Sequence, residues 1–552
     1  MSPAADFTTR LHPLSTPQRE IWFDQMLHAD VPLYNIGGYV DLPGRIDPLL
    51  FEQAVNLLVR RYDSLRLQLT SERDEDGLPL QTFVGPWPVR VPVVDVSGEE
   101  DPEAAAQAFM RQRFEDLFTL EGQPLFRYAL VKLAGDHYYW LLIYHHLIID
   151  GWGVALLNRS LAQIYSALAS GAHPEASTAW GSDLEAPSYS AYIADDRAYV
   201  ESPKFEQQRR FWQEHHPHPP EPLLTPFYRG AFKGALVGSE CEPMVLSRDF
   251  YNRLGGLGQD HGASLFHVLL AALYVYFART SQTDEVTIGL PVLNRANGAY
   301  KQTAGLFANQ SPVRFACGRE LTFAELLGQI SATLKTVYRH QRFPASEIRR
   351  AAGAPPSCPR LCDIGLSYEN HDYQSRFSEI DGHFTALLHS WEQTPLQIFV
   401  RDFHADRDVR LDFVFNQAYF SFQEIRSLQE RIRVVLQAAL TDPHSSIASF
   451  SILPEGERQL LLHDWNATDA DYPRDQCLHQ LFEAQVERTP EAIALMFEDQ
   501  SLTYGELNAR ANRLAHHLIH LGIRPDDRVA IDRKSTRLNS SHEWISRMPS
   551  SA

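Results

Sequence analysis

Residues 125–169 leave the chain few ways to fold, because they hold two strands and a helix with little loop between them. The runs 125–133 and 138–144 are rich in β-branched, aromatic and other large apolar residues, and the turn around Gly135 is typical of a hairpin. A helix is predicted over 154–169. This close succession of strands and helix predicts an α/β unit.

The rest of the first 450 residues continues this mixture of strands and helices. A strand is predicted over 34–40, and a helix follows with Asp47 as its N-cap and Pro48 in its first turn. The apolar stretch 264–278 is too short to cross a bilayer and is typical of a buried helix. Further strands are predicted over 285–290, 396–403 and 409–415.

At about 100–200 residues per domain, a chain of 552 residues is expected to hold three or four domain-sized units. Residues 171–187 are rich in Gly, Ala, Ser and Pro without periodicity, which predicts an internal boundary. A linker is expected over 451–475, and a new amphipathic pattern follows over 476–531. The last stretch, 532–552, holds six serines and no apolar periodicity. It resembles a translated sequencing adapter, so we expect an unstructured sequence artefact.

Charge and cysteine content exclude several classes of function. The 50 Lys and Arg against 69 Asp and Glu give a net charge of -19, which argues against a general nucleic-acid binder. Five scattered cysteines argue for a reducing compartment without a disulfide framework. The N-terminus has no basic start followed by an apolar core, so no signal peptide is expected. These features predict a soluble, cytoplasmic protein without a membrane partner.

The joint between the second strand and the helix carries a pattern typical of a chemical site. It reads His-His-Leu-Ile-Ile-Asp-Gly, from His145 to Gly151. Side chains alternate along a strand, so His145 and His146 are expected to point to opposite faces, and only one of them to reach a substrate. Gly151 allows a ligand or another backbone to approach closely. The alternative is that both histidines satisfy a strand end and that Asp150 only caps the helix.

This segment resembles the His-His-x-x-x-Asp-Gly signature of the condensation domains of nonribosomal peptide synthetases, which belong to the chloramphenicol-acetyltransferase-like superfamily. Other segments resemble further motifs of the same family in the same order, and together they cover about residues 10–450. Tyr62 stands where the family usually has His. These segments are 14–22, 61–66, 189–192, 288–295, 305–310 and 340–344.

The resemblance implies an α/β fold of two similar sheet-and-helix halves that form a V around a tunnel, a chloramphenicol-acetyltransferase-like pseudo-dimer. We expect the N-terminal half over 10–180 and the C-terminal half over 185–450. Residues 502–507 resemble the first motif of an adenylation domain, but no later motif of that domain follows. Residues 476–531 are therefore expected to be an adenylation-domain stub that cannot activate an amino acid.

The resemblance also implies a reaction, amide formation between an acyl thioester donor and the free amine of an aminoacyl group on a carrier protein. We expect His146 to be the key catalytic group, either as the base that takes a proton or as a group that positions the amine. His145, in the same catalytic motif, is expected to be structural. The Gly151 N–H, at a helix start, is expected to stabilise the oxyanion.

Asp150 is expected to organise this loop rather than to act as a base. In the family its counterpart pairs with an arginine, and Arg295 is the first candidate here, with Arg66 second. A buried carboxylate without a partner is costly. Loss of either member of the pair should therefore harm folding as well as rate.

Two branches of the family stay open. Residues 32–39 resemble starter condensation domains, which take a fatty acyl group to begin a lipopeptide, and the chain begins shortly before the first motif. The starter interpretation implies an acyl-CoA or acyl carrier protein as donor, the phosphopantetheine arm of a peptidyl carrier protein as acceptor, and no covalently bound cofactor. The alternative is an elongation domain with a peptidyl carrier donor. In both cases an adenylation domain of the full-length protein is an expected partner.

Other functions agree less well with the residues. An epimerisation domain shares the two histidines, but the segment 152–154 does not resemble its continuation. A catalytically silent recruitment module usually has a degraded histidine motif, and a small-molecule acyltransferase would lack the other motifs. Cys358 and Cys362 have no second pair of ligands nearby in the sequence, so we interpret them as ordinary thiols rather than as a zinc site.

Overall fold

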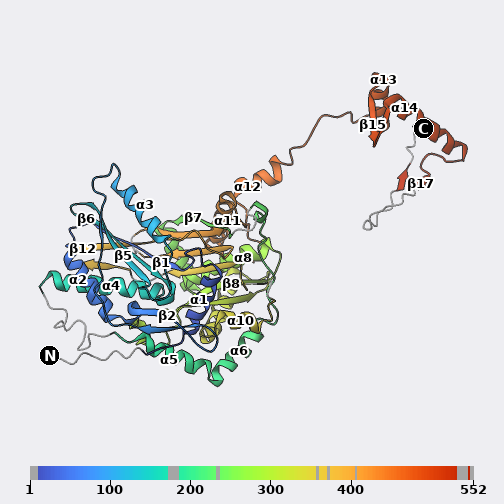
Figure 1. Cartoon of the computed structure of the whole chain (residues 1–552). Helices are drawn as coiled ribbons and strands as arrows, with labels where there is room; N and C mark the ends of the chain where they lie inside the picture. The colour runs from blue at the N-terminus through green and yellow to red at the C-terminus, as the bar shows by residue number, and fades with distance from the viewer. Residues whose placement is uncertain are drawn as a thin grey trace. The chain divides into compact units, whose positions relative to one another are not determined.

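The structure is a computed structural model, and it describes residues 10–171, 186–231, 236–355, 358, 360–369, 373–403, 407–530 and 545–547. The chain divides into two units, a larger one that ends at Arg458 and a smaller one that begins at Gln459. Figure 1 shows the course of the chain through both units.

The larger unit contains a six-stranded sheet built around the predicted hairpin. Its strands, in sheet order, are β11 (Ser375–Phe377), β12 (Ile380–Ala386), β1 (Asn35–Leu42), β6 (His137–His145), β5 (Phe126–Ala134) and β4 (Val93–Asp95). The hairpin consists of β5 and β6, and the predicted strand near residue 35 is β1, which pairs antiparallel with β6. Two helices, α2 (Pro48–Arg61) and α4 (Gly151–Ala169), cover one face of this sheet, and α3 (Pro102–Phe114) covers the other.

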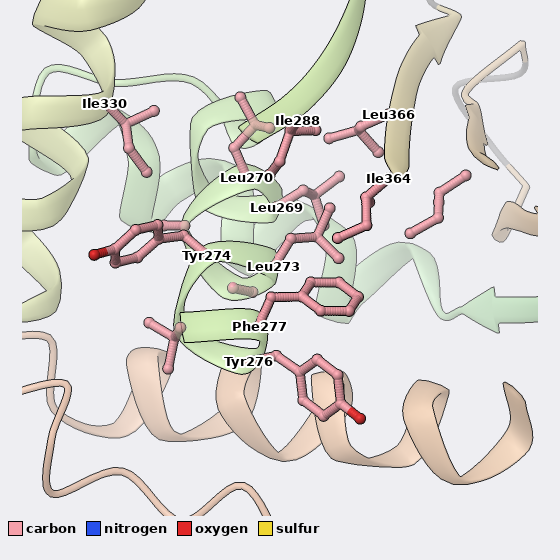
Figure 2. Close-up of a cluster of buried hydrophobic side chains, with 14 of the residues drawn as sticks. Leu269, Leu270, Leu273, Tyr274, Tyr276, Phe277, Ile288, Ile330, Ile364 and Leu366 are labelled. Atoms are coloured by element: carbon pink, nitrogen blue, oxygen red, sulfur yellow. The ribbon is translucent and has the colours of Figure 1, made fainter. Parts of the chain in front are cut away.

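A second six-stranded sheet lies in the same unit. Its strands, in sheet order, are β7 (Ser239–Leu246), β14 (Val409–Asn416), β13 (Leu396–Arg401), β10 (Ile364–Glu369), β8 (Glu285–Val292) and β9 (Asn309–Ala316). Its core is centred on α8 (Leu265–Thr280), which has twelve buried residues among sixteen, as predicted for a buried helix. Figure 2 shows Leu270 and Leu273 of this helix in one cluster with Ile288 and Ile364 of the sheet. The helices α7 (Arg248–Asp260), α9 (Phe323–Val337) and α11 (Phe422–Thr441) pack against α8.

Two strands from the later part of the chain belong to the first sheet. β11 and β12 cross over, and β12 pairs antiparallel with β1. The helix α5 (Tyr189–Val200) also packs against the core of the first sheet. The expected halves 10–180 and 185–450 therefore do not separate the two sheets, because the open edge of β1 is completed by a strand from the later half. Most of the predicted boundary, residues 172–185, lies outside the described residues.

Most predicted elements are present with small shifts at their ends. The helix predicted over 154–169 begins at Gly151, because the Asp150 carboxylate accepts a hydrogen bond from the Gly153 N–H and caps the helix. Asp47 caps α2 in the same way, as predicted. The remaining elements of the larger unit are α1 (Thr16–Leu27), η1 (Asp63–Arg66), β2 (Leu67–Arg73), β3 (Pro79–Phe83), η2 (His146–Ile148), α6 (Pro203–His215), η5 (Arg229–Ala231), η6 (Tyr300–Gln302), η7 (Tyr338–His340), α10 (Ala345–Ala351) and α12 (Glu455–Gln459).

Within the described ranges, no single helix is long and apolar enough to cross a membrane. The pair α7 and α8, bent by 95° at the break between them, meets the length and composition criterion only when the two helices are taken together.

The smaller unit has no buried side chain among its described residues. Leu478 is 86% exposed, Met496 73% and Phe497 69%, so the apolar faces of its helices and strands have no core to pack into. Its elements are η8 (Leu460–Asp464), α13 (Leu478–Arg488), β15 (Ile493–Phe497), β16 (Gln500–Thr503), α14 (Tyr504–His520), β17 (Arg528–Ala530) and β18 (Ile545–Arg547).

Two stretches expected to lack regular structure contain short elements. The expected linker 451–475 begins with the helical segments α12 and η8. Within 532–552, β18 pairs antiparallel with β17, which offers it an unpaired strand edge. The other residues of that stretch lie outside the described ranges.

Candidate active site

The joint between β6 and α4 is where the sequence predicts the chemistry. His145 is the last residue of β6, His146 begins the short helix η2, and Asp150 is the N-cap of α4. The joint is tied to the start of β1, because the His146 N–H donates to the Tyr34 carbonyl oxygen (2.8 Å) and Asn35 lies opposite His145 in the sheet.

His145 is buried and engaged at both ring nitrogens. Its Nδ1 accepts a hydrogen bond from the Leu147 N–H (3.2 Å), so its Nε2 carries the proton and donates to Oε1 of Gln25 (3.3 Å). Burial lowers the pKa of His145 to about 3, and the positive charge of Arg127 acts in the same direction. A neutral ring held at both nitrogens agrees with a structural role for His145.

His146 differs from its neighbour, because the residue as a whole is only half-buried. Its Nδ1 is buried and has no hydrogen-bond partner among the described residues. Burial lowers the pKa of His146 below 6.5, and the nearby Asp150 carboxylate compensates only in part. The imidazole is therefore neutral near pH 7, the form that can accept a proton or a hydrogen bond.

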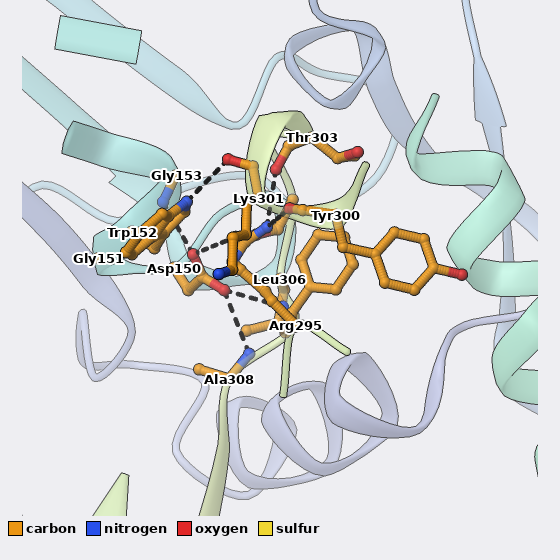
Figure 3. Close-up of polar contacts among 12 residues, drawn as sticks. Asp150, Gly151, Trp152, Gly153, Arg295, Tyr300, Lys301, Thr303, Leu306 and Ala308 are labelled. Atoms are coloured by element: carbon orange, nitrogen blue, oxygen red, sulfur yellow. Dashed lines mark hydrogen bonds and ion pairs between the residues drawn. The ribbon is translucent and has the colours of Figure 1, made fainter. Parts of the chain in front are cut away.

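Asp150 pairs with Arg295, the first candidate of the sequence analysis, at a place where both side chains are 2% exposed. Oδ1 of Asp150 accepts from Nη2 of Arg295 (2.7 Å) and from the Gly153 N–H (2.9 Å), and Oδ2 accepts from the N–H groups of Phe307 (3.0 Å) and Ala308 (3.2 Å). Burial alone would raise the pKa of Asp150, but the Arg295 charge and these donors outweigh burial and lower the pKa. Figure 3 shows this carboxylate enclosed by its partners.

Arg295 is itself fixed by the loop that follows β8. It donates hydrogen bonds to the carbonyl oxygens of Tyr300 and Thr303, the latter at 2.8 Å, and its guanidinium lies 4.0 Å from the ring centroid of Phe307. Arg66, the second candidate partner of Asp150, donates instead to the carbonyl oxygens of Val59 and Val84. Arg66 lies at the end of η1, where these bonds tie α2 to the chain after β3, so the alternative pairing is wrong.

Gly151 is the first residue of α4, so its N–H lies at the positive end of the helix dipole, as the oxyanion expectation requires. The loop that contacts Asp150 contains a second glycine, Gly305, at a position with no room for a side chain. A Cβ on Gly305 would lie 2.1 Å from the Tyr189 ring. Because no side chain intervenes, the Tyr189 hydroxyl reaches the Leu306 carbonyl oxygen (2.7 Å). The segments 189–192 and 305–310, which resemble two different family motifs, are therefore in contact with each other next to Asp150.

Sequence reasoning missed the glutamines of α1 that hold the joint in place. Nε2 of Gln18 donates to the Leu147 carbonyl oxygen (2.9 Å) and to Oε1 of Gln81 (3.0 Å), and Gln25 accepts from His145. The segment 14–22 carried a signal for Gln18, because it resembles a family motif. No pattern in the sequence pointed to Gln25.

Both imidazoles of the joint are neutral, but His145 is engaged at both ring nitrogens, so His146 is the one that the arrangement leaves for chemistry. Asp150 cannot serve as a base, because all four of its acceptor positions are engaged and its charge is paired with a cation. The site therefore suits a reaction that needs one proton acceptor or one hydrogen bond near neutral pH.

Comparisons with known proteins identify the family. The profile described as "Condensation domain" matches residues 9–462, and the one described as "AMP-binding enzyme" matches residues 482–537. The chain is 30% identical over 519 residues to a dimodular nonribosomal peptide synthase of Bacillus subtilis (strain 168), covering 94% of this chain and 21% of that protein. It is 29% identical over 527 residues to malpinin synthetase of Mortierella alpina, covering 94% of this chain and 7% of that protein. The chain thus spans less than a quarter of these relatives.

Solved structures agree with this assignment. The starter condensation domain of rhizomide synthetase RzmA, as a variant in complex with C8-CoA, superposes with a TM-score of 0.70 at 28% identity, covering 80% of this chain and 97% of that one. The first condensation domain of the calcium-dependent antibiotic synthetase, at 24% identity and a TM-score of 0.69, shows the same fold and covers 81% of this chain and 99% of that one. Condensation domains are acyltransferases that form amide bonds. The match over residues 9–462 shows that this chain belongs to the condensation-domain family of nonribosomal peptide synthetases.

Proposed function

We propose that this chain N-acylates the first amino acid of a lipopeptide. In this reaction the amine of an aminoacyl group, carried on the phosphopantetheine arm of a peptidyl carrier protein, attacks the thioester carbonyl of an acyl-CoA or an acyl carrier protein. The observation that carries the proposal is the half-buried, neutral His146, held beside the enclosed Asp150–Arg295 pair.

The amine needs only modest help from the protein. An α-amino group has a pKa of about 8, so roughly a tenth of it is neutral at pH 7. Attack of the amine nitrogen on the thioester carbon gives a tetrahedral oxyanion and an ammonium, and collapse expels the thiolate. The ammonium must lose a proton, which His146 can accept as a neutral imidazole, or His146 can hold the amine in place by a hydrogen bond. The Gly151 N–H is our candidate donor to the oxyanion.

The starter assignment has two supports. The structural relative with a TM-score of 0.70 is described as a starter condensation domain in complex with C8-CoA. In this chain, residues 32–39 resemble starter domains, and one of them, Tyr34, accepts a hydrogen bond from the His146 N–H through its carbonyl oxygen. The AMP-binding match over 482–537 supports an adenylation domain as a partner in the longer protein. An elongation domain with a peptidyl donor is the competing assignment.

The experiment supplies the full chain with an aminoacylated carrier protein and octanoyl-CoA, and follows the mass of the carrier. We expect the carrier to gain one octanoyl group with the wild type and none with His146→Ala. A parallel reaction replaces octanoyl-CoA with a peptidyl carrier. Transfer from the peptidyl carrier alone would make this chain an elongation domain, and transfer from neither donor would contradict the proposed function.

A further inference from the structure

A cavity of about 580 Å³ lies between the two sheets of the larger unit. Its walls come from the end of α3, from β12 and the segment 387–390 that leaves it, and from β7, β13 and β14 of the second sheet. The lining combines apolar side chains such as Phe384 and Phe403 with polar and charged ones such as Ser390, Glu115 and Arg401. A mixed lining suits a pantetheine arm, in which amide groups alternate with methylene and dimethyl groups, better than a saturated acyl chain.

The first sheet connects this cavity with the two histidines, because β12, which lines the cavity, and β6, which ends at His145, both pair with β1. β12 pairs with β1 as far as Ala386, and the Leu387 N–H donates to a β1 carbonyl one residue further on (3.0 Å). β12 ends at Ala386, and His389 follows three residues later in the segment that leaves this strand. His389 lies near enough to His146 for its positive charge to contribute to lowering the pKa of His146.

The segment that carries His389 is fixed by hydrogen bonds from several elements. The N–H and hydroxyl of Ser390 donate to Oε1 of Glu115 (3.2 and 3.3 Å), and the Ser239 N–H donates to the Ser390 carbonyl oxygen (2.8 Å). The Trp391 N–H donates to Nδ1 of His389 (3.2 Å). The orientation of the His389 ring is therefore set by the fold.

These bonds also determine which nitrogen of His389 can donate. Nδ1 accepts from a backbone N–H, so the proton of the neutral ring is on Nε2. Burial lowers the pKa of His389, although Glu392 and Glu115 act in the opposite direction. In the part of the chain that the structure describes, Nε2 meets no hydrogen-bond partner, and His389 lines the cavity. Besides the arginines that line it, the cavity wall thus carries an N–H donor of fixed orientation at His389, which lies near enough to His146 for its charge to act there.

We propose that His389 is a substrate-binding residue, whose Nε2–H donates a hydrogen bond to an amide carbonyl oxygen of a pantetheine arm in this cavity. The inference rests on the proposed function, which brings a pantetheine arm to His146. Both a CoA donor and a carrier-bound acceptor contain pantetheine, so the test treats the two sources separately.

Two substitutions separate the roles of the two ring nitrogens. His389→Asn keeps an oxygen near the Nδ1 position, where it can accept from the Trp391 N–H, but it removes the distant donor. His389→Gln places an amide N–H near the Nε2 position but loses the Nδ1 acceptor. Calorimetry on the full chain measures binding of CoA, and of an aminoacyl-pantetheine in which an amide replaces the thioester. Thermal unfolding of each variant reports on folding separately.

We expect His389→Asn to weaken binding of one of the two probes about tenfold, the loss of one hydrogen bond, and His389→Gln to stay close to the wild type. The weakened probe identifies the source of the arm. The opposite order, with Asn near wild type and Gln weakened, would assign His389 to holding the segment and overturn the inference. Equal binding by all three proteins, or no binding by the wild type, would also overturn it. Failure of the proposed function is a different result, the absence of acyl transfer to the carrier.

Discussion

At the scale of residues, the site depends on one enclosed ion pair and one half-buried histidine. Asp150 was expected to pair with an arginine, and the structure pairs it with Arg295 rather than Arg66. The sequence ranks Arg295 first and Arg66 second, although both arginines lie in segments that resemble family motifs. The pairing is decided by the loop after β8, whose carbonyl groups hold Arg295 in place.

The ion pair leads to the first prediction, on stability. Asp150→Ala and Arg295→Ala should each lower the free energy of unfolding by about 3–5 kcal/mol, because each leaves a buried charge without its partner. The double variant should lose less than the sum of the two, since it leaves no unpaired charge. Urea unfolding measures the free energy of unfolding of each variant. A loss in the double variant equal to the sum of the two single losses would show that the two side chains act independently.

The same pair predicts how stability depends on pH. The pKa of Asp150 is lowered in the folded protein, so its contribution is present above the ordinary value of 3.8 and is lost as the pH falls through the folded value. Arg90→Ala is a matched control, because Arg90 is 87% exposed and its ion pair with Glu52 should contribute less than about 1 kcal/mol.

The second prediction concerns the pH dependence of acyl transfer through His146. Below pH 8 the neutral fraction of the amine falls about tenfold per pH unit. If His146 is the base, protonation of its ring adds a second tenfold per unit below its pKa, which burial places under 6.5. A plot of log kcat/KM against pH should therefore have a slope of one above that pKa and two below it. A slope of one throughout in the wild type would contradict a role for the neutral His146 ring.

At the scale of elements, local sequence patterns predicted most helices and strands. They did not predict the order of strands in the first sheet, which depends on pairing between distant segments. The hairpin β5–β6 and the buried helix α8 follow from propensity and apolar content, which act over a few residues. The crossing of β12 to β1 joins residues more than 300 positions apart, and no local pattern encodes it. His389 was not a candidate either, because only the folded chain brings the segment after β12 to the cavity.

The third prediction tests the strand that lies against the histidine joint. Gly37 in β1 has φ of 140°, and a Cβ there would lie 2.0 Å from the Leu142 carbonyl oxygen of β6. Gly37→Ala should therefore force the two strands apart and lower both the unfolding temperature and acyl transfer. Gly98→Ala is the control, since nothing lies within 4 Å of its Cβ position, and it should leave both unchanged. An unchanged unfolding temperature in Gly37→Ala would mean that the pairing of β1 with β6 tolerates the side chain.

At the scale of the whole molecule, the two units differ in whether they have a core. The larger unit buries two extensive apolar clusters, whereas the described residues of the smaller unit bury none and leave Leu478 86% exposed. Apolar faces without a partner favour association between chains. The described residues of the smaller unit therefore contribute exposed apolar surface.

This difference gives the last prediction. A chain ending at Arg458 keeps both sheets, the Asp150–Arg295 pair and the cavity beside His389, so it should transfer the acyl group at the rate of the full chain. It should also stay monomeric at concentrations where the full chain associates, as light scattering would report. The full chain should show no amino-acid-dependent exchange of pyrophosphate into ATP, because adenylation needs a closed site and the smaller unit has no buried residues among those described. Loss of acyl transfer on truncation would mean that the smaller unit takes part in the condensation site, and measurable exchange would mean that it folds further than its exposed apolar faces indicate.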